Sequence, residues 1–364
     1  MLFNQTQIFL LGALALWLAP LLLICWRYAR LPHAQELLLA VLFLPTLLTD
    51  LLLQAFDSQS GWAFLAGLFN GMPVIIAALL VMAVAKTVLE KGRYRLWLIC
   101  TCMGVAALLQ MPFLLVPLDY KIQLLHQPLL GDLAGHWPLY GYLALCHFLV
   151  LFLAFNVEQK ISDYQAHLSD QVVDVHLYRI SVAAKLFGGL ITLAFVSLVL
   201  TMLVAFDLLP FEHWQGFLQL GYYLLFVALS LSLMESRRYS PSPLDYHQLA
   251  EHHYSDAYLQ HVLQRAERSM IQHKAYKIIG LRIKEFAALA EVNPNALAIA
   301  TRQLLKRNFR VFVYHYRLEY AKNVLMRSDA RVSAVAKRLG FDSEKFLSGV
   351  FVKYIEQMGK EGSH

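Results

Sequence analysis

The feature that most constrains the fold of this chain is a series of long apolar stretches in its first two-thirds. Seven stretches reach the length of about 20 residues that a helix needs to cross a bilayer core. They cover approximately residues 6–27, 34–56, 61–85, 96–117, 138–157, 183–208 and 215–234. Since backbone polar groups in lipid must be satisfied within each segment, these stretches are expected to be helices. The pattern predicts a seven-helix transmembrane bundle over residues 1–234, with no cleavable signal peptide.

The distribution of basic residues predicts the orientation of this bundle. The loops after the first, third and fifth stretches contain nine Lys or Arg residues, whereas the opposite loops contain only Lys121. The positive-inside rule therefore places the N-terminus outside and the chain beyond the seventh stretch in the cytoplasm. Five tryptophans lie at predicted span ends, as an aromatic belt requires: Trp26, Trp62, Trp97, Trp137 and Trp214.

Two polar side chains within the apolar stretches are candidates for a ligand site. Asp50 is costly to desolvate and is expected to face the bundle interior or a cavity, with His147 as one partner that it could have. The alternative is that Asp50 is hydrated at the membrane interface. Prolines 45, 73 and 112 should kink their helices and open polar backbone inside the bundle, which suits a pocket.

Several function classes are disfavoured. The seventh stretch contains no lysine for a retinal Schiff base, and no paired carboxylates indicate a proton pump. The 14 histidines are scattered, and no set of nucleophile, base and orienting residue occurs. The four cysteines lie in or beside apolar stretches, so they are interpreted as small buried side chains rather than metal ligands. We expect no enzymatic activity, no cofactor and no metal site.

The last third of the chain has a different composition. Residues 1–234 contain 10 Lys/Arg against 12 Asp/Glu, whereas residues 235–364 contain 21 against 13. A basic soluble region indicates an acidic partner such as nucleic acid. We divide it into a linker at 235–247, a connecting helix at 248–280 and a domain at 281–364. An apolar stripe over 248–272 is expected to pack on that domain, although a dimerising seam is an alternative.

Helix–turn–helix patterns occur twice after residue 281. Asn293 is a predicted N-cap with Pro294 at the first helical position, and the second helix is expected over about 294–305. A longer helix follows at 310–327. The stretch from Arg331 to Phe346 predicts a helix, a turn at Gly340 with positive φ and a further helix. The expected fold class is all-α, with a double helix–turn–helix domain after the bundle.

Three motifs resemble the DNA-binding domain of AraC/XylS-type bacterial regulators over about residues 281–359. They are Tyr316-Arg317-(x)3-Ala321-(x)3-Leu325, then Val335-Ala336-(x)3-Gly340-Phe341-(x)-Ser343-(x)2-Phe346, and Phe351-(x)-Lys353-Tyr354. The resemblance implies two recognition helices in successive major-groove turns of double-stranded promoter DNA. Carried over by position, the DNA-binding residues would be Asn295, Ile299, Arg302, Lys306, Ser343, Glu344, Lys345, Ser348 and Lys353.

Together these features predict a transcription regulator anchored in the bacterial inner (cytoplasmic) membrane. Its bundle would sense an unknown small-molecule or membrane signal, with Asp50 and His147 as ligand-binding residues, and its tail would bind promoter DNA. Transmission would pass through the seventh stretch and the helix at 248–272, helped by the loop 158–182. A homodimer would raise the effective concentration of the second DNA-binding domain at a two-half-site operator. The alternative function is a transporter or channel whose degenerate tail binds protein, because Ala298 and Gly349 stand where the family has polar or basic residues.

Overall fold

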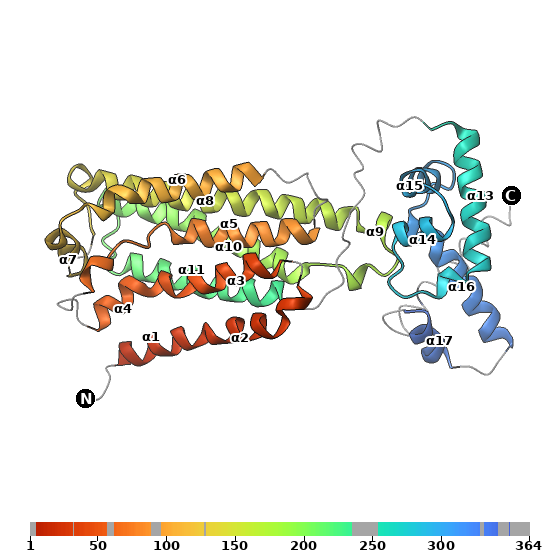
Figure 1. The fold of residues 1–364 in the computed structure, drawn as a ribbon, viewed down its shortest axis with the longest axis horizontal. Coiled ribbons are helices and arrows are strands. Elements are labelled where there is room, and N and C mark those ends of the chain that lie inside the picture. Colours follow the sequence, from red (N-terminus) through yellow and green to blue (C-terminus); the bar gives the residue numbers. More distant parts are fainter. Residues whose placement is uncertain are drawn as a thin grey trace. The chain divides into compact units, whose positions relative to one another are not determined.

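The structure is a computed structural model that describes residues 5–31, 33–56, 62–88, 96–126, 129–234, 254–327, 331–340 and 349. Within these residues the chain is helical and contains no strand, as predicted (Figure 1). It divides into two compact units. Unit 1 comprises Met1–Ser162 and Ile180–Ser236, and unit 2 comprises Asp163–Arg179 and Arg237–His364. The predicted boundary after residue 234 therefore misses one feature, because an internal segment between two apolar helices belongs to unit 2.

Five of the seven predicted spans are helical segments long and apolar enough to cross a membrane. These are Thr6–Arg30, Ala34–Ala55, Leu133–Ala166, Ser181–Ala205 and Trp214–Leu233. The predicted third and fourth spans contain the shorter apolar helices Met72–Lys86 and Trp97–Phe113. The prediction of a long apolar helical region is confirmed, and five of its segments reach spanning length in the described chain.

The third predicted span begins with turns instead of helix. Residues 62–71 contain the 3₁₀ helix η3 (Ala63–Leu65) and Gly67, whose φ of +67° is a conformation that glycine adopts at no steric cost. α5 (Met72–Val88) begins only afterwards, with Pro73 in its first turn, where proline is tolerated. The prediction that Pro73 kinks a helix in mid-span is therefore wrong; this proline stands where the helix begins.

Pro45 interrupts the second span as predicted. α3 (Ala34–Phe43) gives way to the 3₁₀ helix η2 (Leu44–Leu48) and then to α4 (Thr49–Ala55). Proline lacks the backbone N–H that would continue the α-helical ladder, and the tighter 3₁₀ turn accommodates it. The break matters for the site described below, because residues of η2 and α4 line a cavity.

Most of the remaining helices of unit 1 run along one bundle, and α7 lies at one end of it (Figure 1). α11 packs against α10, α5, η2 and α3. The helices are α1 (Gln5–Leu16), α2 (Leu18–Arg27), α6 (Leu96–Leu114), α7 (Leu118–His126), α8 (Leu133–Ala166), α10 (Ser181–Ala205) and α11 (Trp214–Leu233). α8 continues past Ser162, so its last residues belong to unit 2.

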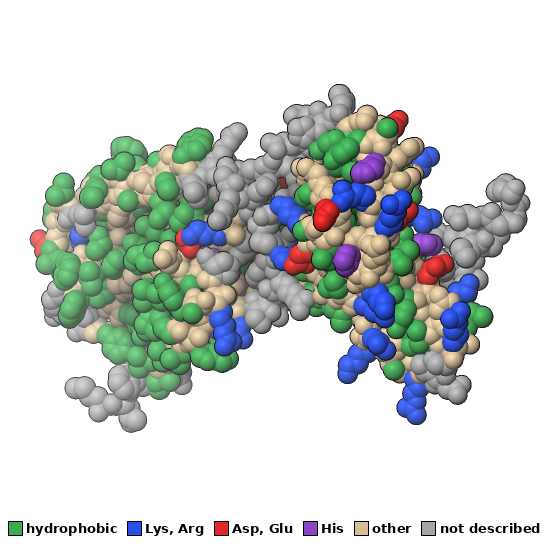
Figure 2. Space-filling view, turned by 45° about the vertical axis from the view of Figure 1, so that its right-hand side comes forward, with side chains coloured by type: hydrophobic (Ala, Val, Ile, Leu, Met, Phe, Trp, Pro, Cys, Tyr) green, Lys and Arg blue, Asp and Glu red, His purple; other side chains and the backbone are tan. Residues whose placement is uncertain are grey.

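The surface of unit 1 is covered by hydrophobic side chains, as a lipid-facing surface would be (Figure 2). Four tryptophans assigned to an aromatic belt are strongly exposed: Trp26, Trp62, Trp97 and Trp137. The belt prediction is wrong for Trp214, which is 1% exposed and donates its indole N–H to the carbonyl of Leu129 at 3.0 Å. A polar partner in the interior explains why this tryptophan is buried.

Unit 2 is built around α13 (Asp256–Gln272) and a helix–turn–helix. The apolar stripe of α13 is buried in the core of the unit, which confirms that it packs on the following helices. Gly340 has φ +73°, as predicted. The other elements are α9 (Leu168–Gln171), η4 (Val175–Leu177), η5 (Ala275–Lys277), α14 (Ile283–Leu289), α15 (Pro294–Gln303), α16 (Phe309–Arg327) and α17 (Val332–Arg338).

Candidate DNA-binding unit and ligand pocket

α14 and α15 are consecutive helices joined by a short turn, and α15 begins with the predicted cap. The side-chain oxygen of Asn293 accepts the N–H groups of Asn295 at 2.8 Å and Ala296 at 3.4 Å, and Pro294 occupies the first helical position. These bonds satisfy N–H groups that have no partner within the helix. α15 packs against α13, α14 and α16, so the second helix is fixed in orientation by three neighbours.

The predicted DNA-facing side of α15 is largely covered. Residues 295, 298, 299 and 302 recur at helical spacing and therefore share one face. Ala298 is 3% exposed and Ile299 is 9% exposed, and both belong to the hydrophobic core of unit 2. The prediction that Ile299 faces DNA is therefore wrong for this arrangement, because a core side chain cannot reach a base edge.

Arg302, on the same face, is held by the segment that unit 2 takes from between two apolar helices. Its Nη2 donates to Oδ2 of Asp170 at 2.5 Å and its Nε donates to Oδ1 at 3.3 Å. Asp170 is 7% exposed in its side chain, whereas that of Arg302 is 48% exposed. The guanidinium remains accessible on one side, but its charge is compensated by a carboxylate of the chain.

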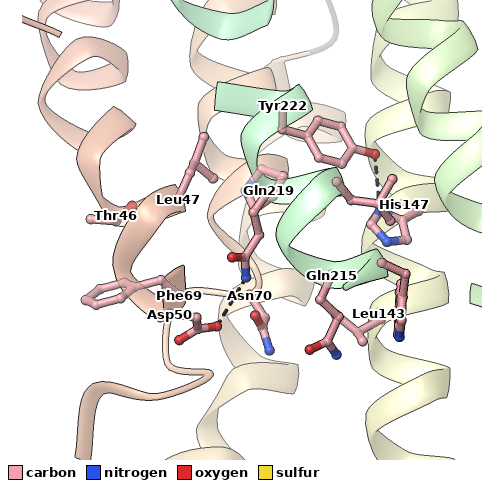
Figure 3. Close-up of a pocket in the computed structure, with 13 residues that line it drawn as sticks. Thr46, Leu47, Asp50, Phe69, Asn70, Leu143, His147, Gln215, Gln219 and Tyr222 are labelled. Atoms are coloured by element: carbon pink, nitrogen blue, oxygen red, sulfur yellow. Dashed lines mark hydrogen bonds between the residues drawn. The ribbon is translucent and has the colours of Figure 1, made fainter. Parts of the chain in front are cut away.

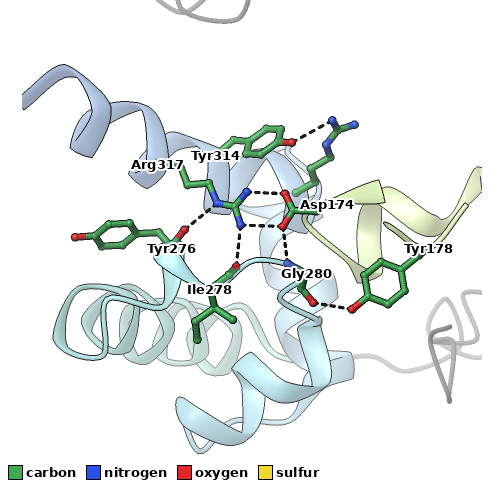
Figure 4. A network of polar contacts seen from close by, with 8 residues as sticks. Asp174, Tyr178, Tyr276, Ile278, Gly280, Tyr314 and Arg317 are labelled. Carbon is green, nitrogen blue, oxygen red and sulfur yellow. Dashed lines mark hydrogen bonds and ion pairs between the residues drawn. The ribbon is translucent and has the colours of Figure 1, made fainter. Parts of the chain in front are cut away.

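A buried ion pair anchors the same segment more deeply (Figure 4). Nη1 and Nη2 of Arg317, on α16, donate to the two carboxylate oxygens of Asp174 at 2.6 Å and 3.0 Å. Both side chains are completely buried. Arg317 also donates to the carbonyls of Tyr276 at 2.8 Å and Ile278 at 2.9 Å. This bidentate geometry with further hydrogen bonds is what a buried pair needs to offset its desolvation.

Backbone contacts complete the attachment. The N–H of Gly280 donates to Oδ2 of Asp174 at 2.6 Å, and the Tyr178 hydroxyl donates to the Gly280 carbonyl at 2.7 Å. Val173 donates its N–H to the Leu281 carbonyl at 3.1 Å, next to an isolated antiparallel bridge between Val172 and Arg282. The side chain of Val173 lies in the core cluster that contains Ile299. We call Asp163–Arg179 the inserted segment, because it is an integral part of the helix–turn–helix unit.

Sequence reasoning did not identify Asp170, Asp174 or Arg317 as site residues. The loop 158–182 was expected only to help transmission, and Arg317 entered only as part of a family motif. One local signal was present: Val172-Val173 is an apolar pair that follows Asp170-Gln171 and precedes Asp174. Such a pair indicates a short buried contact, although it does not reveal the partner.

The other predicted DNA-binding residues have mixed placements. Asn295 is half-buried in the first turn of α15, and Lys306 is exposed just beyond its end. Basic side chains gather on the visible face of unit 2 (Figure 2), and the exposed ones near the two predicted helix–turn–helix units include Arg307, Lys337 and Arg338. Five predicted residues lie outside the described part of the chain: Ser343, Glu344, Lys345, Ser348 and Lys353.

Two side chains of unit 2 have shifted pKa values. Burial raises the pKa of Tyr316 to about 12, with Glu267 and Glu319 adding to the effect. A hydrogen bond to Glu285 raises the pKa of Arg282. Tyr316 is therefore neutral and Arg282 cationic at pH 7, so neither side chain changes its charge near neutral pH.

The two predicted ligand-binding residues line one cavity in unit 1, of about 40 Å³ (Figure 3). Oδ1 of Asp50 accepts the N–H of Gly67 at 2.9 Å, and Oδ2 accepts the side-chain amide of Gln219 at 3.2 Å. Nδ1 of His147 lies 3.1 Å from the Tyr222 hydroxyl, and the two rings stack with centroids 5.8 Å apart. Asp50 and His147 do not bond to each other; each has its own partner on α11.

Among the described residues, no group of three or more His, Cys, Asp or Glu side chains could hold a metal ion. The polar groups that line the cavity are one carboxylate, one imidazole, two hydroxyls and several amides, from Asp50, His147, Thr46, Tyr222, Asn70, Gln215 and Gln219. Comparison with known proteins gives no further guide: no protein-family model matches this chain, and neither does any curated protein or solved structure.

Proposed function

We propose that this chain is a bacterial transcription regulator anchored in the inner membrane, with unit 1 as sensor and unit 2 as the part that binds double-stranded promoter DNA. The observation that carries the proposal is the inserted segment. A stretch between two apolar helices supplies Asp170 to Arg302 on α15 and Asp174 to Arg317 on α16. A helix–turn–helix that incorporates such a segment is coupled covalently to the helices on either side of it.

The bias of basic residues toward the loops after the first, third and fifth apolar stretches supports the orientation. By the positive-inside rule, the side that carries nine of these residues faces the cytoplasm, where DNA is found. The inserted segment lies between the fifth and sixth stretches and falls on the same side as the tail. Both parts of unit 2 are therefore expected in one compartment.

Control of DNA binding would act through the face of α15. The inserted segment compensates the charge of Arg302 and contributes Val173 to the core that encloses Ile299. A signal in unit 1 that displaces the ends of α8 or α10 would change these contacts, because the segment is continuous with both helices. The signal can shift the equilibrium only by its differential affinity for the two states.

Binding of DNA by the full-length protein in lipid nanodiscs tests the proposal. Sites would first be found by chromatin immunoprecipitation and then titrated at several salt concentrations. Arg302→Ala should weaken binding by about 1–3 kcal/mol if Arg302 reads a base, or reduce the salt slope by about 1 if it contacts phosphate. Asp170→Asn should strengthen binding, because it releases the guanidinium from its compensating carboxylate.

Arg268→Ala is the matched control, since it removes the same charge from an exposed position on α13. It should leave affinity nearly unchanged. Absence of salt-sensitive binding to any recovered fragment, with unit 2 shown to be folded, would refute the proposal.

The alternative, a transporter or channel with a protein-binding tail, is favoured by one observation. Ala298 and Ile299 are buried on the face that should read DNA. This alternative expects solute flux in proteoliposomes and no effect of either Asp170→Asn or Arg302→Ala on DNA occupancy. The two functions therefore predict different results for the same variants: DNA binding changes if the chain is a regulator and does not change if it is a transporter or channel.

A further inference from the structure

The cavity beside Asp50 is lined by a carboxylate and by one histidine, His147, which hydrogen-bonds to Tyr222 and not to Asp50. None of its lining residues is Lys or Arg. Both carboxylate oxygens of Asp50 accept hydrogen bonds, one from the Gly67 N–H and one from Gln219, and both donors are neutral. A carboxylate among apolar helices is expected to pair with an opposite charge, because neutral donors compensate only part of its desolvation.

Lys121, the lysine of helix α7, has partners other than Asp50. Lys121 is 5% exposed, donates from Nζ to the Phe64 carbonyl at 3.3 Å and lies 5.9 Å from the centre of the Phe113 ring. No ion pair joins Asp50 to any Lys or Arg in the described part of unit 1. Among the described residues of unit 1, no Lys or Arg therefore supplies a counter-charge to Asp50.

The rest of the lining is suited to an amphipathic ligand. Asn70 and Gln215 line this cavity and an adjoining one of about 30 Å³ that also contains Asp50. Their side chains make no hydrogen bond to another described residue, and Figure 3 shows Asn70 beside Asp50 and Gln215 on the far side of Asn70. Apolar side chains complete the lining, among them Leu47, Phe69 and Leu143. A few convergent polar groups against an apolar wall are typical of small-molecule sites.

We propose that this cavity binds a small organic cation, with an ammonium group against Asp50 and a short apolar chain against Phe69 and Leu47. The amide oxygens of Asn70 and Gln215 accept the remaining ammonium N–H groups. An anion would be repelled by Asp50, and a neutral ligand would leave the carboxylate without a counter-charge. An inorganic cation would not use the apolar side chains. The assignment of this cation as the signal rests on the proposed function, but its binding does not.

The test is ligand-dependent thermal unfolding of the full-length protein in nanodiscs, followed by intrinsic tryptophan fluorescence, since Trp214 lines the cavity. The probes are a series of n-alkylammonium chlorides from methyl to hexyl, and benzylammonium chloride. Benzyl alcohol and sodium benzoate are the neutral and anionic matches of benzylammonium. Sodium chloride at equal ionic strength is the inorganic reference. We expect saturable stabilisation by at least one ammonium, with an optimum chain length, and none by the other three.

Three variants locate the binding. Asp50→Asn should weaken it about tenfold or more, because it removes the charge from a charge-assisted hydrogen bond. Gln215→Leu, in which the new side chain has a similar volume, should weaken ammonium binding severalfold. This variant tests the proposal even if Asp50→Asn folds poorly. Asp119→Asn is the matched control, since it neutralises an exposed carboxylate that does not line the cavity, and it should leave binding unchanged.

The proposal would be overturned if no ammonium had a saturable effect, or if Asp50→Asn bound with the same affinity as the native protein. Equal stabilisation by sodium chloride would also contradict it, because an inorganic cation would then account for the site. The proposed function is judged separately by DNA titration. Asp50-dependent ammonium binding without any DNA binding would refute the proposed regulator but support this inference. DNA binding without Asp50-dependent ammonium binding would support the regulator but refute this inference.

Discussion

Asp50 in unit 1 and Asp174 in unit 2 are both aspartates enclosed by helices, yet their hydrogen-bond and ion-pair partners differ. Asp174 receives a bidentate guanidinium from Arg317 and a backbone N–H from Gly280, and the whole arrangement is buried. Asp50 receives only neutral donors and borders a cavity. The first carboxylate is fully compensated by its own chain, whereas the second is not.

This difference separates two roles for an enclosed charge. A compensated pair such as Asp174 and Arg317 fixes how two segments fit together, and removing one partner leaves an uncompensated buried charge. A carboxylate without a counter-charge beside a cavity is a candidate binding group. Removing each charge in turn and measuring the loss of stability tests whether the two carboxylates differ in this way.

The largest effect is expected when the inserted segment is missing altogether. A fragment of residues 247–364 would contain Arg317 without Asp174, and its core would lack Val173. We expect this fragment not to unfold cooperatively when its melting is followed by circular dichroism. Joining residues 163–179 to its N-terminus through a Gly/Ser linker should restore a cooperative transition. Equal melting of the two fragments would show that the segment is dispensable.

A single substitution in the pair should cost less, but still a large amount. Asp174→Asn is expected to destabilise unit 2 by about 3–5 kcal/mol, because it leaves the Arg317 charge buried and unpaired. Adding Arg317→Met should recover much of that loss. Hydrogen exchange of α14 and α16 in the full-length protein measures both effects. The control is Asp163→Asn at an exposed position of the same segment, and a loss as large in that variant would contradict the assignment.

The smallest effect is expected at Asp50. Asp50→Asn keeps an acceptor for the Gly67 N–H and removes no ion pair, so unit 1 should lose no more than about 1.5 kcal/mol. Thermal unfolding of the full-length protein in nanodiscs, without added amine, provides the measurement. A loss comparable to that of Asp174→Asn would mean that Asp50 is structural, and the contrast between the two carboxylates would disappear.

Features encoded by local pattern were predictable from the sequence. The stripe of α13, the Asn293 cap and the positive φ of Gly340 each depend on a few neighbouring residues, and the structure confirms them. The cost of desolvating Asp50 also identified a residue that lines a cavity. Its partner Gln219 lies 169 residues away, and nothing in the local sequence relates the two.

What the sequence did not reveal depends on such distant contacts. Asp174 and Arg317 are 143 residues apart, and each alone has the appearance of a surface charge. Ile299 was placed toward DNA by position in a family motif, but its burial depends on the core to which it belongs. The late start of α5 was missed because apolar content alone does not distinguish the turns of residues 62–71 from a helix.

The inserted segment also has a consequence for biosynthesis. The ribosome makes Asp174 before α10 and α11, and it makes Arg317 only 143 residues later. Unit 2 therefore cannot close its core while the chain is still being translated through the last two apolar helices. Because domains generally fold as units as they are synthesised, the sequence order delays completion of the helix–turn–helix unit until those helices have been made. A nascent chain whose translation stops within the bundle would therefore contain Asp174 but not Arg317, and it would have no helix–turn–helix that could bind DNA.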